Sequence, residues 1–362
     1  MIKKIQTLDS ALKVIWQDNT ASVFPFIWLR DTDLLGFHPQ TNERLFDLSS
    51  IDVLIKPQDV TLTERGVELQ WPNEERRSLF LSAHLASYAD ACQLVDSAQV
   101  DYKGWFSEFS ATRFIAKDCF EPTQLKVLLQ TLKRDGLVIV SQLRGTHGGE
   151  DFGKLIGFKR ETNFGVTFEV INKADPNNLA YTAVALPLHT DLSNQEKPPG
   201  YQFLHCIENG AHGGESILAD GFSIAQALKR DDPRAYGLLC SEEMPFRFYD
   251  EACDIRFRHP LISEKKGQIE RFIFNAHLAD SFNSIAGNCL QYYMAYQKLM
   301  REIRKDKYAL QLKLQAGEMI IFDNMRVLHG RKSFDPMTGD RHLRGYYIDH
   351  GEVDSKLRML SK

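Results

Sequence analysis

The sequence predicts an α+β protein with a small β-rich N-terminal part and a larger C-terminal part that mixes strands and helices. Three observations predict this class. Residues 1–95 contain short alternating segments between turn residues, apolar runs typical of core strands follow residue 135, and two long segments after residue 220 have helical spacing. A chain of 362 residues is long enough for two domains. We place their boundary near residue 100, which gives domains 1–100 and 101–362.

The N-terminal part alternates apolar and polar residues in segments such as KVIWQD, DVTLT and GVELQW. Alternation with a period of two is typical of strands that bury one face, and the turn residues between these segments favour an antiparallel arrangement. The polar and aromatic stretch SAQVDYKGWFSEFSATRF then leads into the second domain.

The C-terminal part begins with a predicted helix over 123–136, which carries leucines at helical spacing and ends at Gly136, a residue suited to a helix C-cap. The run GLVIVSQL predicts a buried strand, and 199–207 and 214–220 predict two more. Further helices are expected over 222–239 and 288–308. The segment 310–324 predicts a hairpin that delivers His329 just after its second strand.

Composition limits the classes of function. The chain has 43% apolar and 25% charged residues and a net charge of −4, so it lacks the basic surface that binds nucleic acid or an anionic membrane. No run of about eighteen apolar residues is present, and the N-terminus is too polar for a secretion signal. The six cysteines are scattered without a C-x-x-C pair, which predicts reduced thiols. We therefore expect a cytoplasmic protein that needs no nucleic-acid or membrane partner.

Three residues predict a metal site. His189 and Asp191 stand two apart in LPLHTD, and residues two apart at the end of a strand point the same way. A third ligand, His329 in FDNMRVLHGR, lies 140 residues downstream, which suits a barrel or sandwich whose distant segments fold side by side. Two imidazoles and one carboxylate are the ligand set of non-haem Fe(II) oxygenases.

An arginine predicts the companion co-substrate site. Arg341 follows His329 by twelve residues, so a strand, a turn and a returning strand would bring its guanidinium close to the metal. The planar guanidinium can hold a carboxylate in a bidentate manner, as a 2-oxoglutarate anchor requires. Ser216, in GGES, could share that carboxylate. Arg331 and Arg344 are alternatives to Arg341.

Several motifs in order give the chain a closer resemblance. LPLHTD, NNLAYT, KPPGYQFLHC, GGESILADGF, FDNMRVLHGR and RHLRGYYID, together with WLRDTD and FHPQTNER, resemble the gamma-butyrobetaine hydroxylase branch of the taurine dioxygenase-like Fe(II)/2-oxoglutarate oxygenases. The resemblance implies a double-stranded β-helix (jelly-roll) core preceded by a small β-rich domain. It also implies hydroxylation coupled to oxidation of 2-oxoglutarate, with ascorbate as reductant, and a homodimer.

The chain departs from these relatives in one motif. They commonly carry a cysteine cluster after WLRD that binds a structural zinc with a later histidine, whereas this chain has Asp33, Leu34 and Leu35 there. His38 remains, but one histidine does not make a zinc site. No structural zinc is expected.

The resemblance also implies a substrate pocket. Its aromatic cage for a trimethylammonium group matches five positions, and a cage suits a quaternary cation because that cation donates no N–H hydrogen bond and is attracted to ring faces. These positions are Phe164, Phe168, Tyr181, Leu192 and Tyr347, of which Leu192 lacks a ring. The anionic end of the substrate matches Asn178 and Asn275, and His277 is a possible further donor.

The predicted substrate is a small zwitterion that reacts with dioxygen. The first expectation is hydroxylation of gamma-butyrobetaine to carnitine. The alternative within the class is a trimethylammonio- or amino-alkylphosphonate, which has the same cationic end and a more negative anionic end. An alternative of another class is a non-catalytic ligand-binding module or a protein hydroxylase.

Overall fold

The computed structural model describes residues 1–89, 96–172, 181–282 and 289–362. The chain forms two compact units, Met1–Asp96 and Ser97–Lys362. The division lies close to the boundary that the sequence suggested near residue 100, and the existence of two separate domains stays a prediction.

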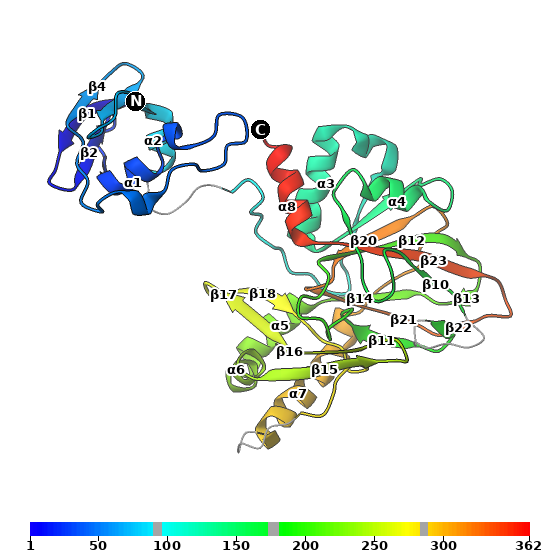
Figure 1. Ribbon diagram of the computed structural model, residues 1–362. Coiled ribbons are helices and arrows are strands. Elements are labelled where there is room, and N and C mark those ends of the chain that lie inside the picture. Colours follow the sequence, from blue (N-terminus) through cyan, green and yellow to red (C-terminus); the bar gives the residue numbers. More distant parts are fainter. Residues whose placement is uncertain (90–95, 173–180, 283–288) are drawn as a thin grey trace. The chain divides into compact units, whose positions relative to one another are not determined.

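The N-terminal unit contains two three-stranded antiparallel sheets with strand orders β1-β2-β3 and β4-β5-β6 (Figure 1). Alternate residues of its strands are buried and form one core with Trp71. Its strands are β1 (Ile2–Thr7), β2 (Ala11–Trp16), β3 (Ala21–Pro25), β4 (Asp59–Leu62), β5 (Gly66–Gln70) and β6 (Arg77–Leu81). Its helices are α1 (Phe26–Asp31) and α2 (Ser82–Ser87), with 3-10 turns η1 (Leu34–Gly36) and η2 (Leu48–Ser50).

Protein contacts organise the loop at which relatives would carry zinc. The buried Asp33 carboxylate accepts a hydrogen bond from the Ser78 hydroxyl, which itself accepts the Trp71 indole N–H at 2.9 Å. The Arg30 guanidinium lies 4.0 Å from the same carboxylate. The His38 Nδ1 accepts backbone amides of the turn that follows it. Asp33 therefore holds the loop through a buried hydrogen-bond chain.

The C-terminal unit is built on two sheets. The larger has seven strands in the order β10-β23-β12-β20-β8-β7, with β9 also paired to β23, and the smaller has the order β11-β21-β14-β19. All pairs in these sheets are antiparallel except β7 with β8. The larger sheet comprises β7 (Thr112–Ile115), β8 (Leu137–Ser141), β9 (Lys159–Arg160), β10 (Phe168–Val170), β12 (Tyr201–Asn209), β20 (Met319–Asp323) and β23 (Arg341–Ile348). The smaller comprises β11 (Leu186–His189), β14 (Ser216–Asp220), β19 (Leu310–Leu312) and β21 (Val327–Arg331).

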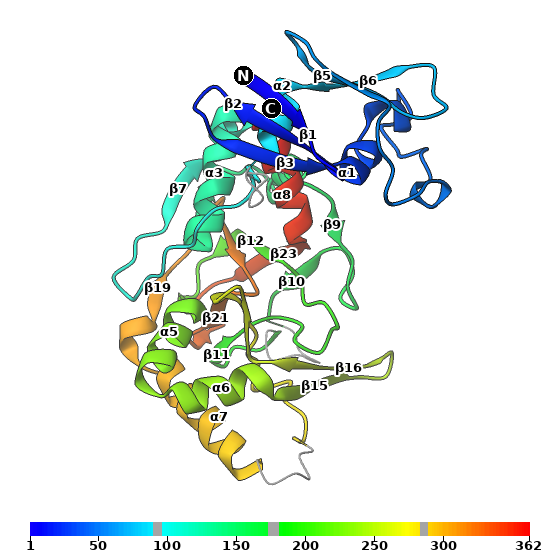
Figure 2. The same ribbon diagram turned by 90° about the vertical axis from the view of Figure 1, so that its left-hand side faces the viewer.

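The two sheets face each other across a shared core. On β20, Ile320 and Phe322 pack with Leu218 of β14 and Val327 of β21, whereas the alternate residue Ile321 faces away. This alternation follows from the two-residue period of a strand. The outer face of the larger sheet is covered by α3 (Pro122–Asp135), α4 (Gly148–Gly153) and α8 (His350–Met359), with η3 (Ala116–Phe120) beside α3 (Figures 1 and 2).

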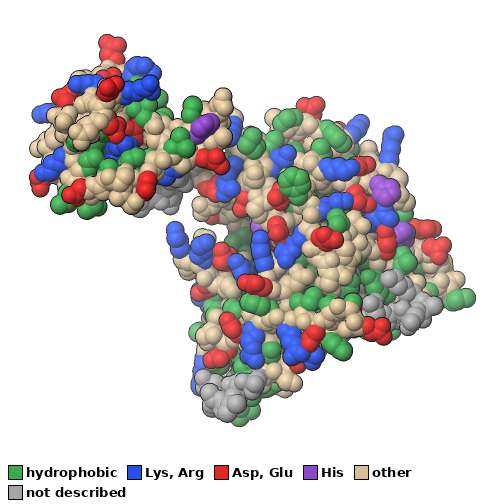
Figure 3. All heavy atoms as spheres, in the orientation of Figure 1, with side chains coloured by type: hydrophobic (Ala, Val, Ile, Leu, Met, Phe, Trp, Pro, Cys, Tyr) green, Lys and Arg blue, Asp and Glu red, His purple; other side chains and the backbone are tan. Residues whose placement is uncertain are grey.

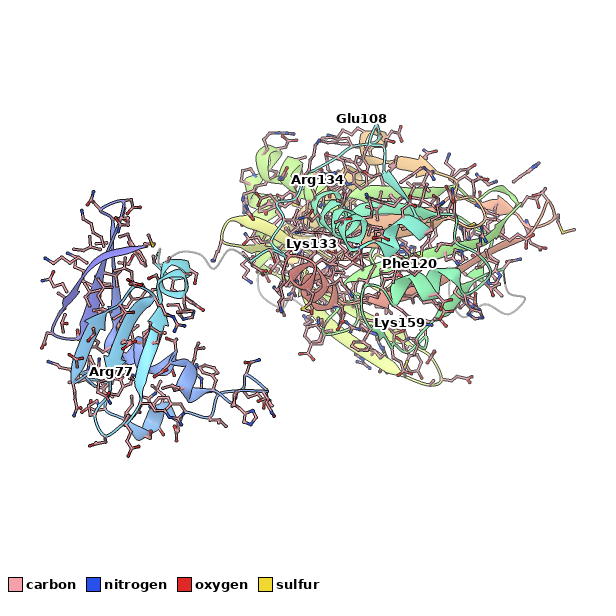
Figure 4. All side chains as sticks on the ribbon, turned by 90° about the horizontal axis from the view of Figure 1, so that it is seen from above. Arg77, Glu108, Phe120, Lys133, Arg134 and Lys159 are labelled. Carbon is pink, nitrogen blue, oxygen red and sulfur yellow. The ribbon has the colours of Figure 1, made fainter. Side chains whose placement is uncertain are left out.

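Other helices cover the outer face of the smaller sheet: α5 (Gly221–Asp231), α6 (Pro233–Ser241) and α7 (Cys289–Ile303). Three two-stranded sheets complete the unit: β13 (His212–Gly213) pairs with the distant β22 (Phe334–Asp335), and two hairpins join β15 (Glu243–Tyr249) with β16 (Asp254–Pro260) and β17 (Ile262–Lys265) with β18 (Gln268–Phe272). On α3, Lys133 forms an ion pair with Asp354 of α8 (Figure 4). Lys and Arg side chains are interspersed with Asp and Glu over the face drawn in Figure 3.

The predicted helix over 123–136 is confirmed, and Gly136 ends it with a left-handed φ of 74°. The single helix expected over 222–239 is wrong, because the chain breaks into α5 and α6 at Asp232. Pro233 has no N–H to continue α5, and the Asp232 carboxylate instead caps α6 by accepting the Ala235 amide at 2.9 Å. The helix expected over 288–308 is shorter: α7 ends at Ile303, and η5 (Asp306–Tyr308) follows as a 3-10 turn.

The hairpin expected over 310–324 is also wrong. β19 pairs with β14 in the smaller sheet, whereas β20 pairs with β12 and β8 in the larger one. The chain crosses between the layers here, as the connections of jelly-roll folds do. Likewise β21 and β23, which carry His329 and Arg341, belong to different sheets and are not a strand with its returning partner.

Candidate active site

Three side chains from neighbouring strands converge on one point. His189 is the last residue of β11, and its Cα partner on β21 is His329. Asp191 lies in the turn that follows β11, where its Oδ1 is 3.3 Å from the His189 Nε2 and 3.5 Å from the His329 Nε2. One ligand atom from each residue lies within 4.8 Å of the others, and the described part of the chain contains no other such group of three.

Hydrogen bonds position two of these residues. The His189 Nδ1 lies 2.9 Å from the Pro187 carbonyl, which can only accept, so Nδ1 carries the proton and the Nε2 lone pair faces the group. The buried Asn324 accepts the Asp191 backbone amide at 2.7 Å and donates to the Asp191 backbone carbonyl at 3.1 Å. Asn324 stands in the motif that carries His329, but no feature of the sequence had indicated its role.

Tyr347 orients the carboxylate itself. Its hydroxyl donates to the Asp191 Oδ2 at 2.7 Å, so Oδ1 is the oxygen that faces both histidines. Burial raises the pKa of Tyr347 well above its ordinary value, with Asp191 adding to the shift, so the hydroxyl remains a donor. The sequence had assigned Tyr347 only to the substrate cage.

The protonation states suit metal binding. Burial opposes ionisation of Asp191, but His329, His189 and the Tyr347 hydrogen bond outweigh it and lower the pKa of this carboxyl overall. Burial, together with the nearby His189, lowers the pKa of His329 to about 3. A carboxylate and a neutral imidazole are the forms in which these side chains bind metals. The donor set therefore fits a divalent ion such as Fe(II).

Tyr347→Phe is expected to weaken metal binding by about 10- to 100-fold, because outer hydrogen-bond partners of metal ligands commonly contribute that much. The measurement is a calorimetric titration of the metal-free protein with Mn(II). Tyr249→Phe is the matched control, because Tyr249 lines the same cavity but makes no hydrogen bond to the three ligands. Equal metal affinity in the two variants would contradict this role of Tyr347.

Arg341 is a buried cation with no acidic partner among the residues that the structure describes. The residue is 8% exposed, and its Nε has no hydrogen-bond partner in the described residues. Burial, reinforced by the nearby Arg331, lowers the pKa of Arg341 to about 10, with no carboxylate opposing the shift. An unpaired buried charge is costly, so this position favours an anionic ligand.

The competing arginines are engaged elsewhere. Arg344 pairs with Glu169 and Glu150. Arg331 donates to the carbonyls of Thr182 and Val184 at 2.6 and 2.8 Å. Of the three arginines, Arg341 is therefore the one best able to hold a carboxylate.

The predicted partner Ser216 lies close to this region. It is the Cα partner of Arg331 across β14 and β21. Two residues earlier, a Cβ placed on Gly214 would lie 3.2 Å from the Arg341 Nε, so Arg341 packs against the segment that carries Ser216. The co-substrate roles of Arg341 and Ser216 stay predictions.

A cavity of about 360 Å³ lies beside the His–Asp–His group and includes His189 and Asp191 in its wall. Six of the seven residues expected to bind substrate line it, and the seventh, Asn178, lies outside the described residues. The lining residues are Phe164, Phe168, Val170, Tyr181, Leu186, His189, Asp191, Leu192, Arg247, Phe248, Tyr249, Asn275, His277, Leu278 and Tyr347.

The aromatic part of the lining depends on a glycine. The Phe168 ring lies 5.3 Å from the Tyr347 ring, and a Cβ on Gly345 would come within 2.3 Å of that phenylalanine. Only a residue without a side chain at 345 leaves room for this ring. Leu192 adopts a left-handed φ of 54°, unusual for a bulky residue, in the turn that carries Asp191.

The polar part of the lining differs from the expectation in detail. The Asn275 amide donates to the Thr190 carbonyl at 3.1 Å, and its oxygen accepts the backbone amides of His277 and Leu278. Asn275 therefore caps a turn and retains one N–H for a ligand. Arg247 of β15 also lines the cavity; no spacing or motif in the sequence had indicated it.

Comparison with known proteins decides the family. Residues 106–347 match the family described as "Taurine catabolism dioxygenase TauD, TfdA family". The chain belongs to the TauD/TfdA dioxygenase family. The family resemblance inferred from the motifs is thus confirmed.

Two relatives resemble this chain in sequence along nearly its whole length, and a solved structure resembles its fold over about two thirds of it. The gamma-butyrobetaine dioxygenase of Pseudomonas sp. (strain AK-1) is 36% identical, covering 98% of this chain and 94% of that protein. The human gamma-butyrobetaine dioxygenase is 31% identical, with 99% and 97% covered. A taurine dioxygenase structure from Burkholderia xenovorans has a TM-score of 0.53 at 14% identity, covering 69% of this chain and 90% of that one.

The match to the TauD/TfdA family, together with taurine dioxygenase-like structures from Burkholderia xenovorans, shows that the fold is that of Fe/2-oxoglutarate-dependent oxygenases. This fold is consistent with the expected jelly-roll core. The comparisons do not test whether the N-terminal unit corresponds to the small β-rich domain expected from the family, so this correspondence stays a prediction. Among the described residues, no helix has both the length and the apolar character needed to cross a membrane.

Proposed function

We propose that this chain is an Fe(II)- and 2-oxoglutarate-dependent dioxygenase that hydroxylates gamma-butyrobetaine to carnitine. The observation that carries the proposal is the cavity of about 360 Å³ that places aromatic rings beside the His189, Asp191 and His329 group. Relatives named gamma-butyrobetaine dioxygenase, at 31% to 36% identity over nearly the whole chain, support it.

In this proposal His189, Asp191 and His329 hold Fe(II), and Arg341 with Ser216 holds the distal carboxylate of 2-oxoglutarate. When bound, the iron supplies dioxygen activation coupled to oxidative decarboxylation of 2-oxoglutarate. The protein contributes position: β11 and β21 hold the two imidazoles side by side, Tyr347 holds the Asp191 carboxylate, and Asn324 holds the Asp191 backbone.

The cavity lining selects the substrate. A trimethylammonium group is attracted to the faces of aromatic rings, which are supplied here by Phe164, Phe168, Tyr181 and Tyr347. Leu192 completes this part of the wall but has no ring. Asn275 and, in the family pattern, Asn178 act at the anionic end. Ascorbate as reductant, a homodimer and a cytoplasmic location complete the proposal.

The test is turnover with Fe(II), ascorbate and 2-oxoglutarate, following succinate and hydroxylated product by mass spectrometry. Substrates are gamma-butyrobetaine, its phosphonate analogue, trimethyllysine and unmethylated 4-aminobutyrate. We expect kcat/KM for gamma-butyrobetaine to exceed that for 4-aminobutyrate by at least about tenfold, because the cage acts on the quaternary cation.

Succinate formed in equal amount with hydroxylated betaine is the expected result. Product from the phosphonate or from trimethyllysine, with none from gamma-butyrobetaine, would replace the proposed substrate while keeping the reaction. No hydroxylation of any of the four would contradict the proposal.

A further inference from the structure

The cavity lining contains a guanidinium near the polar turn. Arg247 lies on β15, and its backbone N–H donates to the Leu278 carbonyl at 2.8 Å. This bond ties β15 to the turn that carries Asn275 and His277, so the three side chains lie in one part of the lining.

One edge of the Arg247 guanidinium is bonded to a carboxylate, and the other has no hydrogen-bond partner among the described residues. Its Nε and Nη2 donate to the two oxygens of Asp254 at 2.8 and 3.1 Å. A guanidinium has five N–H donors, so Nη1 and the second Nη2 hydrogen still form a bidentate edge. Asp254 also pairs with Arg256, the Cα partner of Arg247, so one carboxylate serves two cations, with Asp280 acting at longer range.

His277 adds a second donor group. Its side chain is exposed at the cavity wall, its ring lies 6.2 Å from the His189 ring, and it makes no side-chain hydrogen bond to another described residue. An imidazole can place an N–H donor toward a carboxylate, and the side chain lies in the same part of the lining as Arg247. In contrast, the oxygen of Asn275 is already bonded to backbone amides.

We propose that Arg247 and His277 form the subsite for the anionic end of the substrate, with the remaining N–H of Asn275 in support. This inference rests on the proposed function. In this arrangement the rings of Phe168, Tyr181 and Tyr347 receive the ammonium end, while Arg247 and the turn at 275–278 receive a carboxylate. The ligand class is a short zwitterion whose carboxylate is bound by the open edge of a guanidinium.

The test measures binding without turnover. Anaerobic calorimetry on the protein loaded with Fe(II) and 2-oxoglutarate compares gamma-butyrobetaine with butyltrimethylammonium, which keeps the cation and lacks the carboxylate. Arg247→Gln is expected to raise the Kd for gamma-butyrobetaine at least about tenfold and to leave that for butyltrimethylammonium unchanged, because the lost bonds are charge-assisted.

Two further variants separate direct contact from other causes. Arg256→Gln removes the same charge from the facing strand position but does not line the cavity, so both Kd values should stay near those of the wild type. Arg247→Lys keeps the charge without the planar fork and should recover only part of the affinity. Because Arg256 still pairs with Asp254, Arg247→Gln leaves no carboxylate unpaired.

The outcomes are distinct. If Arg247→Gln raised the Kd of both ligands equally, or of neither, the proposed subsite would be overturned and the proposed reaction would still stand. If Arg256→Gln weakened gamma-butyrobetaine binding as much as Arg247→Gln does, Arg247 would act only through long-range charge, and the subsite would also be overturned. A wild-type protein that binds neither ligand would overturn the proposed function and the subsite with it.

Discussion

His189→Ala is expected to abolish iron binding and turnover. The imidazole supplies one of three converging ligands, its Nδ1 bond to the Pro187 carbonyl presets the Nε2 lone pair, and the described part of the chain offers no second group of this kind. The loss should exceed the about 10- to 100-fold that removal of an outer partner costs. Iron content after loading and dialysis, with succinate formation, measures both effects.

The control for this variant is His212→Ala, which removes an exposed histidine on β13 outside the ligand group. It should retain iron binding. Stoichiometric iron in His189→Ala, or substantial hydroxylation by it, would show that His189 is not a ligand.

The second large effect concerns stability. Arg326→Met is expected to lower the free energy of unfolding by about 3–5 kcal/mol, because it leaves a buried carboxylate without its cation. Arg326 and Asp220 are 1% and 0% exposed, and the guanidinium donates to Asp220 at 2.9 and 3.2 Å. It also donates to the carbonyls of Arg134 and Lys103 at 2.9 and 2.7 Å. One side chain thus joins three distant segments.

Urea denaturation followed by tryptophan fluorescence and circular dichroism measures this loss. Arg113→Met is the control within the same unit, since the half-exposed Arg113 pairs with Glu318 at the surface and should contribute less than about 1 kcal/mol. Arg326→Met combined with Asp220→Asn should be less destabilised than Arg326→Met alone, because the stranded charge is removed. If the Arg326→Met variant were as stable as the Arg113→Met variant, the role of the buried pair of Arg326 and Asp220 would be contradicted.

The candidate metal ligands and the proposed co-substrate residues could be named from the sequence because their signals are local. The two-residue spacing of His189 and Asp191, and the motifs around His329 and Arg341, state which chemical groups are available. The structure adds what spacing cannot show: the pairing of His189 with His329 across β11 and β21, and the absence of an acidic partner for Arg341 among the described residues.

Other parts of the site carried no such signal. Asn324 and Tyr347 act on Asp191 from positions 133 and 156 residues away in the chain, and only the packing of β20 and β23 in one sheet brings them near it. Arg247 reaches the cavity from the hairpin of β15 and β16, in which no motif had indicated a functional residue. Conversely, Asn275 proved to be largely engaged in capping its own turn.

The same division holds for the fold. The sequence by itself determined the α3 helix with its Gly136 cap, the buried strands, the candidate metal ligands and the family. Only the tertiary structure decided that 310–324 crosses between two sheets instead of forming a hairpin, and that the Arg331 guanidinium is held by backbone carbonyls whereas the Arg341 Nε has no partner among the described residues. Local periodicity records which face of a segment is buried, whereas the choice of partner depends on the packing of segments far apart in the chain.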